Sequence, residues 1–353
     1  MNVSLLLAFC LISSLICCSW AEDGHDFTIQ EKPCDPAADA ENLKNFLQSQ
    51  KSKDLLQLLT GRTNKQRQDI KKSYKAKFNQ KLSSNLVEYF QNRTEMRLMM
   101  FVARLMYTNE SILARNILFS LDVAHSDAFK KDWGYMSIII TTNGAQLKAI
   151  VDEYQRIFKR ALKDDLNAKM RKESGKKFLA SIIDAGVENG RPANGVQADQ
   201  IEKYYDAVPT KGNNCAFDKN KDLYHLMTGF SFEHLKKFIT NYKNDKGKEV
   251  IDQIDDHCGD GEVKEAYLRI IRFATDPYTY YATDLHDGFN DDKEHVLDGV
   301  DRILITRSEI DLRNVNKAYE AKFDHDIKHS IKYHYKEKLA GYGDALSMIM
   351  KGN

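Results

Sequence analysis

The stretch Leu304-Ile305-Thr306-Arg307-Ser308-Glu309-Ile310-Asp311-Leu312 opens a helical pattern that continues to Phe323 and determines how the rest of the chain is interpreted. Behind it, apolar residues recur at Leu312, Val315, Tyr319 and Phe323. This spacing places them on one face of a helix, which predicts that the face is buried against neighbouring helices.

The same pattern occurs 245 positions earlier in the chain. The matched pairs are Arg62 with Arg307, Ile70 with Val315, Tyr74 with Tyr319, and residues 76–78 with 321–323. Two weaker copies lie between them, around Tyr154 and Tyr242. Four copies predict an internally repeated, all-helical protein.

The composition of the 353 residues is that of a globular protein, with 29% charged and 10% aromatic residues. A net charge of +1 gives no overall field that favours nucleic acid, so no nucleic-acid partner is predicted. No nucleophile motif, phosphate-binding glycine loop or His-Glu-x-x-His is present, and we expect the protein not to be an enzyme.

The N-terminus differs from the rest of the chain. Residues 3–18 are almost wholly apolar, and Ser19-Trp20-Ala21 precedes the acidic Glu22-Asp23. This pattern predicts a cleaved signal peptide, residues 1–21, and a secreted, extracellular protein. The run lacks a preceding Lys or Arg and approaches the length of a membrane span, so an uncleaved anchor remains the alternative.

The remaining chain divides into a tail and four repeats with room for five short helices each, named A to E in chain order. We expect an N-terminal tail at 22–38, repeat one at 39–107, repeat two at 112–185, a linker at 186–197, repeat three at 198–274 and repeat four at 279–350.

On these residues the chain resembles the annexin family. Four repeats of five helices, the longer linker after repeat two and the stretch from Thr306 to Leu312 carry the resemblance, together with residues 58–68. It implies an all-α curved disc in which repeats one and four pack together, as do two and three. The family's turn arginine is retained as Arg62 and Arg307, for which we expect a buried ion pair that ties the helix B–C corner. Thr142 and Phe230 stand at the equivalent positions of repeats two and three.

The resemblance also implies binding of anionic phospholipid through bridging calcium. In the family, a glycine-containing A–B loop turns carbonyl oxygens onto the ion, and a carboxylate from the D–E loop completes a shell that needs six to eight oxygens. The loops of repeats one and two lack glycine, and Tyr89 and Lys172 replace their carboxylates. The residual candidates lie in repeats three and four, where His257 and His334 take that position; they are Gly212, Asp256, Gly288, Asp291 and Asp292.

Three cysteines follow the predicted signal peptide, so at least one is left without an internal partner. Because the A–B and D–E loops meet in the family, the resemblance implies a disulfide between Cys215 and Cys258. Cys34 in the tail is then a free thiol that can link two chains. Two sequons, at Asn92 and Asn109, predict glycosylation of a secreted chain.

Two functions remain open from the sequence. The first is a secreted, annexin-like protein that binds phospholipid surfaces with weak or partly lost calcium dependence. The second is an extracellular interaction or structural protein, with an unknown protein partner, that kept the scaffold and lost its lipid sites.

Overall fold

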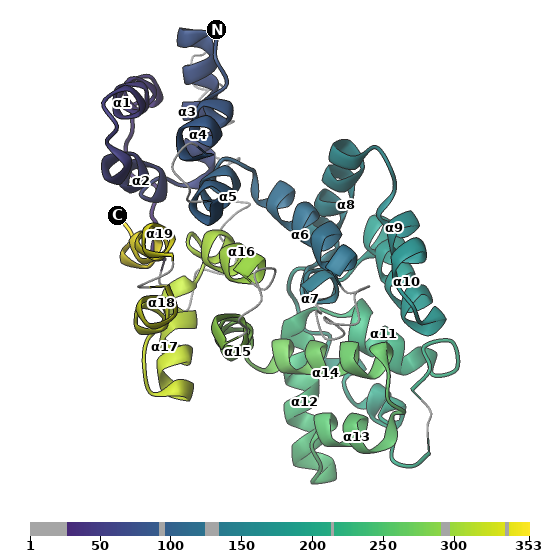
Figure 1. Cartoon of the computed structure of the whole chain (residues 1–353). Helices are drawn as coiled ribbons and strands as arrows, with labels where there is room; N and C mark the ends of the chain where they lie inside the picture. The colour runs from purple at the N-terminus through teal and green to yellow at the C-terminus, as the bar shows by residue number, and fades with distance from the viewer. Residues whose placement is uncertain (1–26, 92–95, 124–133, 213–214, 291–296, 336–338) are drawn as a thin grey trace, which may run out of the picture.

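The computed structural model describes residues 27–91, 96–123, 134–212, 215–290, 297–335 and 339–353. Regular structure within these ranges is helical, without a strand (Figure 1). The predicted signal peptide lies outside them. No helix in the described ranges is both long and apolar enough to cross a lipid bilayer.

The helices form four consecutive groups that correspond to the repeats. Repeat one contains α1 (Pro36–Gln48), α2 (Ser52–Thr60), α3 (Asn64–Phe78), α4 (Leu82–Gln91) and α5 (Met96–Leu105). Repeat two contains α6 (Asn109–Val123), α7 (Gly134–Ile140), α8 (Gly144–Phe158), α9 (Leu162–Lys169) and α10 (Glu173–Asn189). Repeat three contains the 3₁₀ helices η3 (Ala198–Gln200) and η4 (Glu202–Ala207), then α11 (Lys221–Gly229), α12 (Phe232–Lys246), α13 (Val250–His257) and α14 (Glu262–Thr275). Repeat four contains α15 (Pro277–Asn290), α16 (Leu297–Arg307), α17 (Leu312–Phe323), α18 (Ile327–Tyr335) and α19 (Ala340–Lys351).

Two helices are shorter than the sequence pattern suggests. In repeat three, helix A is only the six-residue 3₁₀ helix η4, because Pro209 excludes the helical conformation at Val208, which is extended. In repeat four, α17 begins at Leu312 because residues 308–311 form a turn. That turn leaves the side chain of Glu309 available for the contact with repeat one described below.

The recurring tyrosine is the centre of each repeat. Tyr74, Tyr154, Tyr242 and Tyr319 are all at most 2% exposed. Three of them form a hydrogen bond with a helix D residue eleven positions later: Tyr74 with Asn85, Tyr154 with Asp165, and Tyr319 with Ser330. Helix C then ends five residues after each tyrosine in a left-handed residue: Asn79, Lys159, Gly247 and Asp324. The sequence repeat thus records one packing arrangement made four times.

Two hydrophobic cores pair the repeats as the family resemblance implies. One core takes its buried residues from positions 114–274, which are repeats two and three. The other takes them from positions 40–106 and 280–350, which are repeats one and four, together with Ile112 from the start of repeat two. Residues far apart in sequence therefore lie side by side, and Figure 1 shows α2 next to α19.

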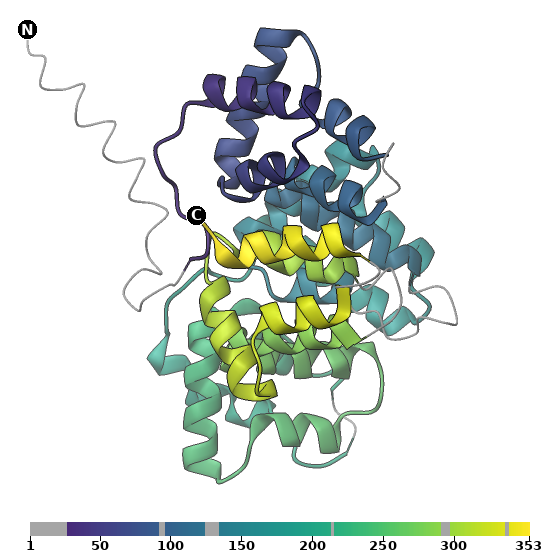
Figure 2. The same ribbon diagram turned by 60° about the vertical axis from the view of Figure 1, so that its left-hand side comes forward.

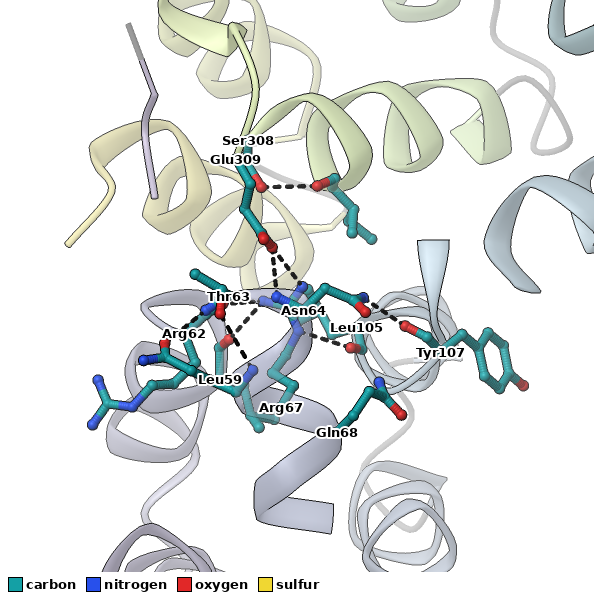
Figure 3. A network of polar contacts seen from close by, with 12 residues as sticks. Leu59, Arg62, Thr63, Asn64, Arg67, Gln68, Leu105, Tyr107, Ser308 and Glu309 are labelled. Atoms are coloured by element: carbon teal, nitrogen blue, oxygen red, sulfur yellow. Dashed lines mark hydrogen bonds and ion pairs between the residues drawn. The ribbon is translucent and has the colours of Figure 1, made fainter. Parts of the chain in front are cut away.

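A polar network joins repeats one and four at their B–C corners, the turns between the second and third helices (Figure 3). The Glu309 carboxylate accepts a hydrogen bond from the Asn64 backbone N–H at 2.6 Å and lies 3.7 Å from the Arg67 guanidinium. Arg67 is fully buried and also donates to the carbonyls of Leu59, Arg62 and Leu105. Burial lowers the pKa of Arg67 to about 10, partly offset by the charge of Glu309.

The two ends of the described chain lie at the same corners. The backbone N–H groups of Thr28 and Ile29 donate to the Ser308 carbonyl at 3.0 Å, and Asn353 donates to the Gly61 carbonyl at 2.9 Å. In Figure 2 the C-terminus lies on one side of the molecule, and the ends of α18 and α19 that approach each other lie on the opposite side. The B–C corners and the D–E corners of repeats one and four therefore define two faces.

The linker between repeats two and three is fixed by a buried arginine. Arg191 is 7% exposed and donates to the carbonyls of Met227 and Phe230 at the B–C corner of repeat three. Its guanidinium also lies 4.1 Å from the centroid of the Phe232 ring. The Leu59 and Arg62 carbonyls occupy the equivalent positions in repeat one, where Arg67 donates to them. Arg191 thus does in repeat three what Arg67 does in repeat one. Burial lowers the pKa of Arg191 to about 9.

Candidate functional site

The candidate site of each repeat lies where its A–B loop approaches its D–E corner, the end of helix D and the start of helix E. A calcium ion at this place needs carbonyl oxygens from the first segment and a carboxylate from the second. The four repeats provide different residues there.

In repeat one, the loop between α1 and α2 has three residues and no glycine. Gln50 makes its tight turn with a φ of 60°, a conformation that usually requires glycine, Asn or Asp. Tyr89, at the carboxylate position, packs against the core instead. Neither residue brings a carboxylate to this corner.

In repeat two, the A–B loop lies outside the described residues. The carboxylate position is occupied by Lys172, an exposed residue immediately before α10. Between residues 169 and 177 there are five basic residues and one acidic residue, so the corner carries a net charge of +4. Like charges repel a cation, which makes this corner unsuitable for calcium.

In repeat three, the structure contains the disulfide between Cys215 and Cys258, with their Cα atoms 5.3 Å apart. The bond joins the segment after η4 to the residue that ends α13. Gly212 has a φ of +70°, the left-handed conformation that turns a carbonyl in a calcium loop, and no atom lies near its absent side chain.

The acidic residues at the repeat-three corner are partly neutralised by a lysine. The Lys264 ammonium lies 2.8 Å from the Asp255 carboxylate and 3.4 Å from that of Asp260, and it donates to the Asp255 carbonyl at 2.7 Å. These contacts raise the pKa of Lys264 and lower that of Asp255. Asp256 is exposed at the end of α13, next to His257.

In repeat four, the candidate glycine does not form a loop. Gly288 is buried within α15, and its neighbour Phe289 stacks on His334 of α18 with ring centroids 6.1 Å apart. The imidazole at the carboxylate position thus makes an aromatic contact. Asp291 and Asp292 lie outside the described residues.

The described residues contain no side-chain cluster of the kind that binds a calcium ion. Across the described ranges, no three His, Cys, Asp or Glu side chains cluster closely enough to hold a metal ion. In repeat three the disulfide holds Cys215 next to Cys258, two residues after Asp256, but Lys264 already places a positive charge at that corner. Calcium requires six to eight oxygens, and at the four positions where a closing carboxylate is expected the described residues are Tyr89, Lys172, His257 and His334, none of which has a carboxylate.

The turn arginines make ion pairs in both repeats that retain them. Arg62 in repeat one contacts Asp39 of α1 through two hydrogen bonds of 2.7 and 3.1 Å. Arg307 in repeat four contacts Asp311 at the start of its own helix C, and its guanidinium lies 4.8 Å from the Tyr281 ring centroid. The hydrogen bond to Asp39 raises the pKa of Arg62, and both arginines hold helix ends together.

The two predicted glycosylation sites differ in their surroundings. Asn92 lies outside the described residues. Asn109 begins α6, its side-chain oxygen is buried, and Ser111 of the same sequon is 6% exposed and donates to Glu153. In the folded chain this sequon is therefore largely covered.

Sequence reasoning missed Arg67, Arg191 and the role of Glu309. Each acts across a repeat boundary, so the helical period of a single repeat contains no information about it. The one available signal for Arg191 was its place beside Gly190 in the linker: Gly190 packs closely against Gly144, and the Gly144 N–H donates to the Arg191 carbonyl.

Comparison with known proteins gives consistent results. The sequence model of the annexin family matches residues 298–340. Human annexin A13 is 25% identical over 284 residues, covering 79% of this chain and 84% of its own length. Mouse annexin A10 is 26% identical over 312 residues, covering 86% and 91%. Among solved structures, annexin III matches with a TM-score of 0.79 at 22% identity, covering 94% of this chain and 98% of its own, and a calcium-bound annexin (Sm)1 matches with 0.76 at 20%, covering 92% and 93%.

Proposed function

Because the chain is a divergent member of the annexin family, we propose that it is secreted and binds phospholipid membrane surfaces with weak or partly lost dependence on calcium. One observation carries the proposal. The four-repeat scaffold is kept, while Tyr89, Lys172, His257 and His334 stand where calcium-binding carboxylates are expected. The apolar run before residue 22 and the disulfide of repeat three support an extracellular location.

The second candidate is an extracellular interaction or structural protein that lost lipid binding. It is favoured by the Phe289–His334 contact, which fills one calcium corner with packed rings. Cys34, which is half-buried, then offers a thiol that joins two chains. A dimer that disappears with reductant on a denaturing gel supports this link, and its loss in Cys34→Ser identifies the residue.

Sedimentation with vesicles of phosphatidylserine and phosphatidylcholine, with calcium and with chelator, separates the two candidates. Membrane binding predicts co-sedimentation with the anionic vesicles and a modest change on chelation. No sedimentation in either condition favours the second candidate. Calorimetric titration with calcium should show no strong sites, and several micromolar sites would contradict the weak calcium dependence.

A further inference from the structure

We propose that the D–E corners of repeats two and four bind anionic phospholipid headgroups directly, so that lysine and arginine side chains supply the positive charge that a bridging calcium ion would supply. This inference rests on the proposed membrane-binding function and specifies which side chains of the protein contact the membrane surface. It concerns Arg171, Lys172 and Lys176 in repeat two, and Lys332 with Tyr333 in repeat four.

The first step is the charge at the corner of repeat two. Arg171 and Lys172 are exposed, and Lys176 is half-buried one turn into α10. Lys169 and Lys177 form ion pairs with Asp122 and Glu173, and Lys172 and Lys176 lie near the Glu262 carboxylate of α14. Lys172 therefore places an ammonium where a calcium site needs a carboxylate, and an ammonium attracts phosphate without a metal.

The second step is the contrast with the adjacent corner. Gly175 of α10 packs directly against Glu262 of α14, so the D–E corners of repeats two and three are neighbours. Residues 255–265 contain five acidic residues and one lysine, a net charge of −4, beside the +4 of residues 169–177. The acidic residues of repeat three therefore repel an anionic surface unless a cation neutralises them, whereas the basic residues of repeat two attract one.

The third step is a matching corner in repeat four. The exposed residues of α18 are Lys328, His329, Lys332 and Tyr333, which share one side of the helix. Tyr333 is 77% exposed, more than any other large hydrophobic side chain among the described residues. A tyrosine ring beside a lysine suits the interface between water and lipid, where aromatic residues are enriched.

These features favour a lipid surface over a single bound anion. The basic residues are spread over two repeats, and their side chains are exposed rather than gathered in a cavity. Each Lys or Arg near an anionic membrane increases the affinity about fivefold, so several separate basic residues together give substantial membrane affinity.

The test is sedimentation of the purified protein with phosphatidylserine-containing vesicles in chelator at low salt. Wild type should bind, should release between about 50 and 200 mM salt because the charges are screened, and should ignore pure phosphatidylcholine. The variant R171Q/K172Q/K176Q should lose about 100-fold in affinity. Lys332→Gln should lose about fivefold, and Tyr333→Ser a smaller factor.

A matched control removes three exposed lysines from repeat three, in K236Q/K237Q/K248Q, on and just beyond α12, which Figure 2 shows on the side of the C-terminus. It should bind as wild type does. Circular dichroism confirms that each variant is folded, and Lys332→Gln and the salt dependence of wild type provide tests that do not depend on the triple variant.

The outcomes distinguish this inference from the function on which it rests. Vesicle binding that requires calcium overturns the inference and leaves the proposed function intact. An equal loss of vesicle affinity in the control variant has the same consequence. Absence of vesicle binding in every condition overturns both. Retention on heparin without vesicle binding assigns the basic corners to a polyanion instead and also overturns the inference.

Discussion

The B–C corners and the D–E corners each occupy equivalent places in the four repeats, yet the two kinds of corner have diverged in different ways. At the B–C corners, Arg67 and Arg191 come from unrelated positions and satisfy the same backbone carbonyls of repeats one and three. At the D–E corners, neighbouring repeats carry charges of +4 and −4. At the B–C corners, different residues make the same hydrogen bonds to backbone carbonyls. At the D–E corners, the net charge differs between neighbouring repeats.

This difference has a physical cause. Carbonyls at a buried helix end must find donors, because an unpaired buried polar group costs about 1–3 kcal/mol. An exposed corner carries no such requirement, so its charge can change without loss of the fold. We therefore expect substitutions at the B–C corners to reduce the stability of the fold and substitutions at the D–E corners to alter binding.

The largest effect is expected for Arg191→Ala. It removes two hydrogen bonds from a buried guanidinium and leaves the Met227 and Phe230 carbonyls unpaired. Two buried carbonyls without a partner, at about 1–3 kcal/mol each, predict a decrease of about 2–5 kcal/mol in the free energy of unfolding. Urea denaturation followed by circular dichroism measures it, with the exposed Arg313→Ala as control. Equal stability of the two variants would show that linker and corner are not coupled.

Removal of the disulfide tests the one D–E corner that is covalently fixed. The bond closes a loop across a sequence separation of 43 residues, for which chain entropy predicts about 3–4 kcal/mol of stabilisation. The double variant C215S/C258S should lose this amount, and reductant should destabilise wild type but not the variant. A reductant-insensitive wild type would mean that the two cysteines are not bonded in solution.

The sequence was sufficient for the scaffold because the scaffold is periodic. The helical spacing of Leu312, Val315 and Tyr319 and its copies predicted the all-α repeats, and the structure confirms the pairing of one with four and two with three. Helix A of repeat three was less predictable, since one proline shortened it to six residues.

The candidate site was less accessible to sequence reasoning. The position of Gly288 within α15 depends on where that helix ends, and helix ends are poorly determined by periodicity. Lys264 was missed because its contacts with Asp255 and Asp260 arise only when α13 and α14 meet at the corner. The placement of Glu309 against repeat one likewise depends on tertiary packing.

A smaller effect is expected at the B–C corner of repeat one. In Arg62→Ala the Asp39 carboxylate, whose side chain is 7% exposed, loses both of its guanidinium hydrogen bonds. Because Arg62 itself is 26% exposed, we expect a loss of about 2 kcal/mol, between the values for surface and buried pairs. Asp39→Asn combined with Arg62→Ala should be less harmful than the sum of the single changes, as a double-mutant cycle measures. Additive losses would mean that the pair contributes nothing as a pair.

The smallest expected effect is a gain in stability rather than a loss. It concerns Glu262, which lies where the basic D–E corner of repeat two meets the acidic D–E corner of repeat three. Burial raises the pKa of Glu262, and the nearby Lys172 and Lys176 only partly counteract it. Since one carboxylate oxygen is buried without a hydrogen bond, the ionised form is disfavoured in the folded protein. Below the ordinary pKa of about 4.3 the side chain is protonated in both the folded and the unfolded chain, and it then contributes no difference. As the pH rises through the folded pKa, the unfolded state gains stability relative to the folded state.

Glu262→Gln should therefore stabilise the protein at pH 7 by up to about 1 kcal/mol after allowance for solvent screening, and the gain should vanish near pH 4. Thermal unfolding at both pH values measures it, with the paired and exposed Glu173→Gln as control. A loss of stability at pH 7 would show that Lys172 and Lys176 hold Glu262 as an ion pair, and that the basic and acidic corners are coupled across the repeat boundary.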